Sequence, residues 1–140
     1  GAPEKDAQLL YDFGIKMGLA FQLQDDYLDV YGDPAVFGKK IGGDILCNKK
    51  TFMLITALSL SEGEDKETLL NWLRATDYVA EEKIQSVTAL YNKVGVPELC
   101  QARIDAYYKE GLELLDKVNV ESSLKEELKK FVCHLMDRKL

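Results

Sequence analysis

Apolar residues recur every three or four positions along most of the chain, and the strict alternation typical of strands is absent. The clearest run places five side chains on one face of a helix: Leu9, Phe13, Met17, Phe21 and Leu28. A second run with the same spacing contains Leu112, Leu115 and Val118. The pattern therefore predicts an all-α fold.

The punctuation between the apolar runs predicts about six helices. The first begins at about Glu4, just after Pro3, and ends at about Tyr31, before the turn residues Gly32, Asp33 and Pro34. Further helices are predicted over residues 50–60, 66–75, 79–94, 98–118 and 122–139, with short connections at 61–64, 95–97 and 119–123. Residues 32–48 are rich in glycine and are predicted to form the one long irregular segment.

Two glycines, Gly14 and Gly18, lie four residues apart inside the first predicted helix. Glycine at such a position costs about 0.8–1.0 kcal/mol relative to alanine, so the pair marks the close approach of either another helix or a ligand. Gly18 shares a helical face with Gln22, Asp25 and Asp29, which favours the ligand without excluding helix packing.

Length and composition limit the possible classes of protein. With 140 residues, 46% of them hydrophobic, the chain can form one modest core, so a single helical unit is expected. The net charge of −6 argues against nonspecific binding to nucleic acid or to an anionic membrane surface. No stretch reaches the roughly 20 apolar residues of a membrane span, and no secretory signal pattern is present.

The three cysteines, Cys47, Cys100 and Cys133, are widely separated and form no CxxC pair. This spacing fits neither a zinc site nor a disulfide framework. A reducing, cytoplasmic compartment and a soluble protein are therefore expected.

Three carboxylates, Asp25, Asp26 and Asp29, lie late in the first predicted helix. Like charges four residues apart destabilise an isolated helix by about 0.2–0.5 kcal/mol, and acids near a helix C-terminus oppose its dipole. A sequence that tolerates both penalties is expected to gain stability elsewhere, most simply from bound cations.

The segment after this helix adds a fourth acid, Asp44, and four lysines: Lys39, Lys40, Lys49 and Lys50. Carboxylate oxygens suit Mg²⁺, which usually shares its remaining coordination positions with water and substrate phosphates. Lysines near the same cavity can bind the same anion. The composition of this region predicts a site for Mg²⁺ and a diphosphate.

Two other ligand loops are excluded by spacing. An EF-hand counted from Asp25 would have Tyr27, Val30 and Val36 where an oxygen ligand, a glycine and a glutamate are required. Residues 38–43 have neither the spacing of a Walker loop nor a preceding strand. For the three acids considered alone, a solvated acidic helix face remains an alternative.

A longer ordered pattern surrounds the acids. Phe21-Gln22 precedes Asp25-Asp26-x-x-Asp29, and Gly32-Asp33, Gly38-Lys39-x-x-Gly42-x-Asp44, Lys49 and Thr51 follow. This stretch resembles the second aspartate-rich motif and the following loop of the trans-isoprenyl diphosphate synthases, the polyprenyl synthetase family. The resemblance implies that the chain is the C-terminal half of the isoprenoid (terpenoid) synthase helical bundle.

The resemblance also implies a reaction. Members of the family condense isopentenyl diphosphate with an allylic diphosphate and so make geranyl, farnesyl, geranylgeranyl or longer polyprenyl diphosphates. Three Mg²⁺ ions clamp the diphosphate group of the allylic substrate, which leaves to give an allylic carbocation. The double bond of isopentenyl diphosphate attacks this cation, and loss of a proton to the released diphosphate completes the elongation. A homodimer is the expected assembly, with no nucleic acid and no membrane span involved.

Site residues follow from the resemblance. Asp25, Asp29 and Lys39 are the expected catalytic residues. The expected metal ligands are Asp25, Asp29 and Asp44, with Asp26 acting directly or through water. Lys39 and Lys49 would hold the allylic diphosphate and Gln22 would orient the substrate, while Phe21 would line either the hydrocarbon pocket or the core. Arg138 would close over the second diphosphate, or belong to a frayed basic terminus.

The chain departs from the family pattern because it contains one aspartate-rich motif where a complete synthase needs two. It is therefore expected to be a C-terminal portion that is inactive alone. Three other readings stay open: a noncatalytic regulatory partner of a prenyl synthase, a terpene cyclase-like protein, and a helical interaction domain with an acidic surface.

Overall fold

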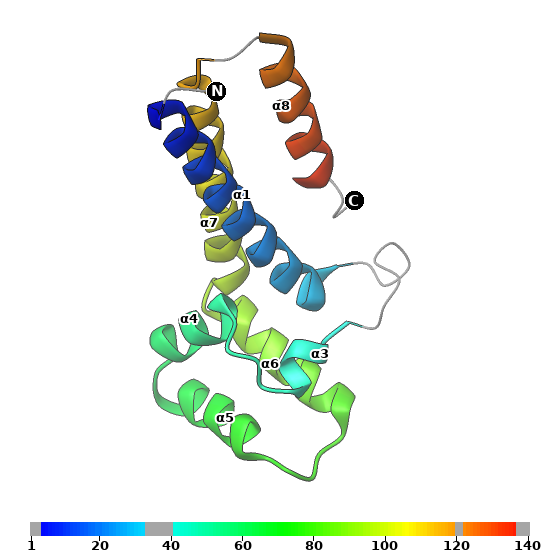
Figure 1. Cartoon of the computed structure of the whole chain (residues 1–140). Coiled ribbons are helices and arrows are strands. Elements are labelled where there is room, and N and C mark those ends of the chain that lie inside the picture. The colour runs from blue at the N-terminus through cyan, green and yellow to red at the C-terminus, as the bar shows by residue number, and fades with distance from the viewer. Residues whose placement is uncertain (1–3, 33–40, 120–121, 137–140) are drawn as a thin grey trace. The chain divides into compact units, whose positions relative to one another are not determined.

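The computed structural model describes residues 4–32, 41–119 and 122–136, in which there are seven helices and no strand (Figure 1). The helices are α1 (Glu4–Tyr31), α3 (Gly43–Leu46), α4 (Phe52–Leu60), α5 (Gly63–Arg74), α6 (Ala80–Lys93), α7 (Val96–Asp116) and α8 (Ser122–Met136). The all-α prediction is confirmed. A search of the described helices for one with the length and apolarity to cross a bilayer finds none.

Most helix boundaries agree with the sequence pattern within one or two residues; α4 begins two residues later than predicted, and α5 and α7 begin earlier. α1 has the predicted ends, whereas α5 begins at Gly63, inside a predicted connection, where φ is 57° and Glu64 and Asp65 lie in the first turn. α7 likewise begins earlier than predicted, because Pro97 in its first turn removes an N–H that has no helical partner. The predicted end of the last helix lies outside the described residues.

The glycine-rich segment was predicted to be irregular throughout, and this is wrong for α3. Gly42 has a φ of 97°, a left-handed conformation that glycine adopts without strain, and its N–H donates to the Asp29 carbonyl at 2.7 Å. The short helix then begins at Gly43. Its position is set by a contact with α1 that periodicity along the chain does not reveal.

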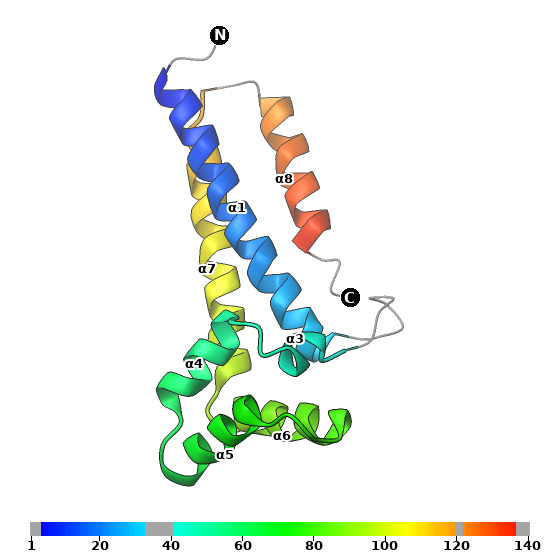
Figure 2. The same ribbon diagram turned by 60° about the horizontal axis from the view of Figure 1, so that its bottom comes forward.

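The chain divides into two compact units, each described here by itself: residues 1–24 with 102–140, and residues 25–101. In the first unit, the α1 and α7 segments lie side by side in both views (Figures 1 and 2). Phe13, Met17, Leu115 and Val132 form its buried core. A Cβ at Gly111 would meet the Met17 methyl group, so glycine permits close packing of α7 against α1.

The second unit is organised around α6, which contacts α3, α4 and α5. Val87 and Leu90 on α6 are buried, as are Met53 and Ala57 on α4 and Leu69 on α5. The last turns of α1, the whole of α3 and the residues that follow it also belong to this unit. The acids of the sequence motif and Lys49 are thus carried by one compact body.

Candidate functional site

The centre of the site is an ion pair between the end of α1 and the segment after α3. Lys49 Nζ lies 3.2 Å from Asp26 Oδ1 and 3.9 Å from Asp44 Oδ2. The Asp26 side chain is 9% exposed and that of Asp44 22%, whereas the Lys49 side chain is 50% exposed. The ammonium group therefore lies between a buried and a partly buried carboxylate while it stays accessible from solvent.

Asp29 connects α1 to α3 directly. Its side chain is buried, and its Oδ2 accepts a hydrogen bond of 2.8 Å from the backbone N–H of Asp44. The Asp29 carbonyl accepts the Gly42 N–H as well, so this one residue satisfies donors on both sides of the α3 start. Asp44 is consequently positioned by a neighbouring acid.

Charge and burial shift the pKa of two groups beside Asp26. The hydrogen bond from Lys49 to Asp26 raises the pKa of Lys49, and the negative charges of Asp26 and Asp44 raise it further. Burial raises the pKa of Cys100 to about 12, and the charge of Asp26 adds to this effect. Lys49 is therefore a cation and Cys100 a neutral thiol at physiological pH.

Thr51, the last residue of the sequence motif, has a structural role. Its Oγ1 accepts the Leu54 N–H at 3.2 Å and so caps the start of α4. Its own N–H donates to the Lys49 carbonyl at 2.9 Å. A residue that begins a helix thus also restrains the backbone of Lys49.

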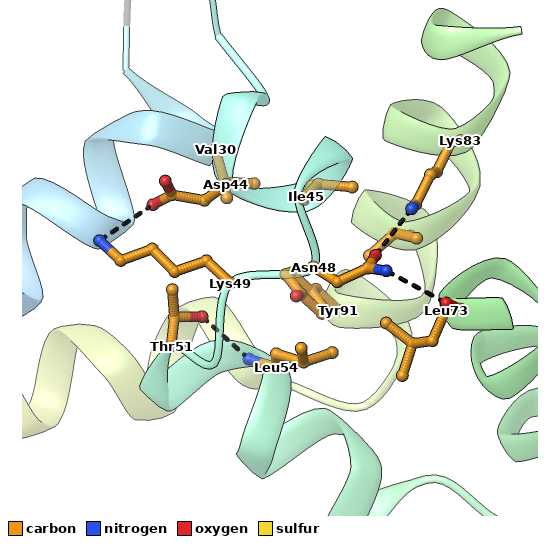
Figure 3. Close-up of a pocket in the computed structure, with 11 residues that line it drawn as sticks. Val30, Asp44, Ile45, Asn48, Lys49, Thr51, Leu54, Leu73, Lys83 and Tyr91 are labelled. Atoms are coloured by element: carbon orange, nitrogen blue, oxygen red, sulfur yellow. Dashed lines mark hydrogen bonds and ion pairs between the residues drawn. The ribbon is translucent and has the colours of Figure 1, made fainter. Parts of the chain in front are cut away.

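Asp44 and Lys49 line a small pocket with Ile45, Asn48 and Thr51 (Figure 3). Its volume is about 10 Å³, near the minimum for one water molecule, so it cannot hold a diphosphate or a prenyl chain. No group of three or more metal-binding side chains is gathered closely enough to hold an ion within the described ranges. The exposed side of Lys49 is accessible from solvent, outside this pocket.

The donor set nevertheless fits Mg²⁺ of the kind predicted. The acids around Lys49 offer hard carboxylate oxygens, and Mg²⁺ is commonly held by one or two carboxylates together with substrate phosphates and water. Asp25 is exposed, and Asp44 is only partly buried. Carboxylates with this exposure suit a site in which an anionic ligand and water complete the coordination of the ion.

The structure brings together only some of the predicted site residues. Asp26, Asp29, Asp44 and Lys49 are joined by the contacts above, and Asp25 lies in the same unit. Phe21 and Gln22 belong to the other unit, where Phe21 is partly buried and Gln22 is exposed. Two further predicted residues, Lys39 and Arg138, lie outside the described residues.

The glycine pair of α1 has no packing partner in the described part of the chain. A Cβ at Gly14 or Gly18 would have no other atom within 4 Å, and both residues are exposed. The helix-packing explanation therefore has no support from the described residues. The ligand explanation stays a prediction.

Sequence reasoning missed two residues beside the pocket, Asn48 and Lys83. Lys83 lies on α6 at the spacing of the buried residues Val87 and Leu90, and its side chain is 1% exposed. A lysine in register with an apolar helix face is the signal that could have identified it. Asn48 gave a weaker signal, since asparagine in a glycine-rich segment is common in turns.

The described chain is thus an all-α protein in which one compact unit joins Lys49 to the carboxylates of Asp26 and Asp44. The family model of the polyprenyl synthetases matches residues 1–92 of the chain. The chain belongs to the polyprenyl synthetase family.

Similar proteins have consistent names. The chain is 35% identical over 127 residues to the short chain isoprenyl diphosphate synthase of Methanothermobacter thermautotrophicus, a match that covers 89% of this chain and 38% of that protein. The structure of a geranylgeranyl pyrophosphate synthase matches with a TM-score of 0.86 and 34% identity over 99% of this chain and 43% of the other.

A third match comes from Corynebacterium glutamicum. It is a geranylgeranyl pyrophosphate synthase complexed with isoprenyl diphosphate and magnesium, with a TM-score of 0.85 and 29% identity over 97% of this chain and 38% of the other. The chain thus spans about two fifths of the length of the relatives that it matches.

Proposed function

We propose that this chain is the C-terminal portion of a Mg²⁺-dependent trans-prenyltransferase that condenses isopentenyl diphosphate with an allylic diphosphate in isoprenoid biosynthesis. The observation that carries the proposal is the half-exposed Lys49 ammonium held between Asp26 and Asp44. Membership of a family whose named relatives make isoprenyl diphosphates supports it. So does the magnesium in one structural relative.

In this proposal the acids hold Mg²⁺ and the lysines hold diphosphate. Asp25, Asp26, Asp29 and Asp44 offer carboxylate oxygens, although Asp26 Oδ1 already accepts a hydrogen bond from Lys49 and Asp29 Oδ2 accepts one from the Asp44 N–H. When bound, Mg²⁺ would supply positive charge that stabilises the departing diphosphate; the resemblance implies three ions. Lys49 would donate charge-assisted hydrogen bonds to the same oxygens.

The other predicted residues complete the proposal. Lys39 would bind the allylic diphosphate beside Lys49, Gln22 would orient the substrate, and Phe21 would help to keep water from the reacting carbon. Arg138 would contact the second diphosphate. None of these side chains needs to act as a nucleophile, because the bond is made between the two substrates.

The expected setting of the enzyme is a homodimer in the cytoplasm. Three unpaired thiols, two of them exposed, support a reducing compartment. The dimer is implied by the resemblance and is part of this proposal.

The proposal is tested with the protein made from the gene's complete reading frame. Radiolabelled isopentenyl diphosphate is supplied with dimethylallyl, geranyl or farnesyl diphosphate and Mg²⁺, and the products are separated by chain length. Asp25→Ala should reduce product formation by at least about 100-fold, and the exposed Asp77→Ala should leave it unchanged. A folded wild-type protein that extends none of the three primers would refute the enzyme assignment and favour a regulatory partner.

A further inference from the structure

Lys83 is a buried lysine whose side-chain amine contacts neutral groups in the described part of the chain. Its Nζ donates to Asn48 Oδ1 at 2.7 Å and to the Leu46 carbonyl at 3.5 Å, and it lies 4.6 Å from the centroid of the Tyr78 ring. Its side chain is 1% exposed. Burial of an ammonium group is costly even when it is hydrogen-bonded, and an apolar side chain of similar volume would fill the space at lower cost. Packing alone therefore does not account for a lysine here.

Asn48 transmits this contact to the neighbouring backbone. Its φ is 56°, a left-handed conformation that asparagine tolerates better than most residues, and its N–H donates to the Ile45 carbonyl at 3.2 Å. The Asn48 side chain bonds on both sides, because Nδ2 donates to the Leu73 carbonyl at 3.1 Å while Oδ1 accepts from Lys83 (Figure 3). The turn after α3 is thus tied to the end of α5 and to α6.

The residues fixed by this turn are those of the candidate site. Lys49 follows Asn48 directly, and the Lys49 N–H donates to the Asp44 carbonyl at 2.9 Å. α3 is therefore held at both ends, by Asp29 where it begins and, where it finishes, by Tyr78 and Lys83, which donate to the Leu46 carbonyl at 3.3 Å and 3.5 Å. At Gly42 the chain also packs on Ile84, the next residue of α6.

We propose that Lys83, acting through Asn48 and the Leu46 carbonyl, is a positioning residue that fixes Asp44 and Lys49 for the binding of Mg²⁺ and diphosphate. Lys83 would touch neither ligand. Its role in catalysis rests on the proposed function. Its amine supplies two directed hydrogen bonds that an apolar residue lacks, so the spacing between the Asp44 carboxylate and the Lys49 ammonium depends on it.

The test compares two buried positions on α6 in the full-length protein. Lys83→Met keeps side-chain length and removes the hydrogen bonds, whereas Leu90→Ala loses packing on the same helix and leaves those bonds intact. Both variants should lose thermal stability. Only Lys83→Met should raise the KM for the allylic diphosphate and the Mg²⁺ concentration for half-maximal rate, by about 10- to 100-fold.

Asn48→Gly provides a second variant that tolerates the positive φ and lacks the amide, so it decides the question if Lys83→Met does not fold. It should show the same kinetic change. In the Asn48→Gly background, Lys83→Met should have less than about a twofold further effect, because the two residues act in one chain of contacts.

Hydrogen exchange of residues 43–50 and calorimetric binding of Mg²⁺ with inorganic diphosphate give readouts that do not need turnover. Lys83→Met should speed exchange in this segment and weaken binding, and Leu90→Ala should do neither selectively. Equal behaviour of the two variants in exchange, binding and kinetics would overturn the proposal. If the wild-type protein lacks prenyltransferase activity, the proposed function fails while exchange and binding still decide the role of Lys83.

Discussion

Two substitutions of Asp29 distinguish the effect of its hydrogen bond to the Asp44 N–H from the effect of its negative charge. Asp29→Ala removes the acceptor of the Asp44 N–H and leaves that donor, at the start of α3, without its partner. Asp29→Asn keeps an oxygen in nearly the same place and removes only the negative charge. Asp25→Ala, one turn earlier on α1 at an exposed position, is the matched control.

The expected magnitudes follow from opposing effects. A hydrogen bond to a charged acceptor contributes about 1.5–3 kcal/mol to stability, and a neutral one about 1 kcal/mol. Loss of the charge also relieves repulsion from Asp25, by about 0.2–0.5 kcal/mol, and the unfavourable dipole at the α1 C-terminus, by about 0.3–1 kcal/mol. Asp29→Ala should therefore lower the free energy of unfolding by about 1 kcal/mol, and Asp29→Asn should stay within about 0.5 kcal/mol of wild type.

Urea unfolding of the full-length protein measures these differences, and hydrogen exchange at the Asp44 amide localises them. The alanine variant should lose protection at that amide, and the asparagine variant should retain most of it. Asp25→Ala should keep the protection of the Asp44 amide and yet lose at least about 100-fold in product formation. If Asp29→Ala is as stable as wild type and keeps Asp44 protected, the capping role assigned to Asp29 is wrong.

Three further predictions concern the lysine, the thiols and the isolated chain. Lys49→Met should raise the KM for the allylic diphosphate by about tenfold through loss of a charged hydrogen bond, whereas the neighbouring exposed Lys50→Met should not; equal kinetics of the two variants would contradict the site. Mass spectrometry after brief native alkylation should find Cys47 and Cys133 modified and Cys100 modified only after unfolding, because burial raises the pKa of Cys100 to about 12. The 140-residue chain alone should incorporate no isopentenyl diphosphate, and analytical sedimentation should show that it self-associates. If this chain were as active as the full-length protein, a second acidic motif would not be needed.

The long helices could be predicted from sequence because their signals are local. α1 has a sustained apolar period and a glycine turn at its end, and both of its predicted boundaries agree with the structure. α3 could not be predicted in this way, since its start depends on Asp29, fifteen residues before Asp44. The early start of α7 could not be predicted because a proline such as Pro97 can either end a helix or lie in the first turn of one.

The residues gathered at the candidate site could be predicted in part from the sequence, whereas their contacts could not, and the binding of metal and anion stays a prediction. Clustered acids and lysines indicated a metal and anion site, but the pairing of Lys49 with Asp26 joins residues 23 apart in sequence. Lys83 is one of many lysines until α6 packs against α3, and only then does its ammonium meet Asn48. Such contacts are properties of the tertiary structure.

We propose that the acids around Lys49 bind a divalent cation together with an allylic diphosphate. A crystal structure of the full-length protein tests this, with Mn²⁺ in place of Mg²⁺, an unreactive thio analogue of the allylic diphosphate, and anomalous scattering to locate the metal. We expect anomalous peaks between the diphosphate and carboxylates that include Asp25, with Lys49 Nζ in hydrogen-bond contact with a diphosphate oxygen. A diphosphate bound elsewhere, or bound with no metal at these acids, would refute the proposed site.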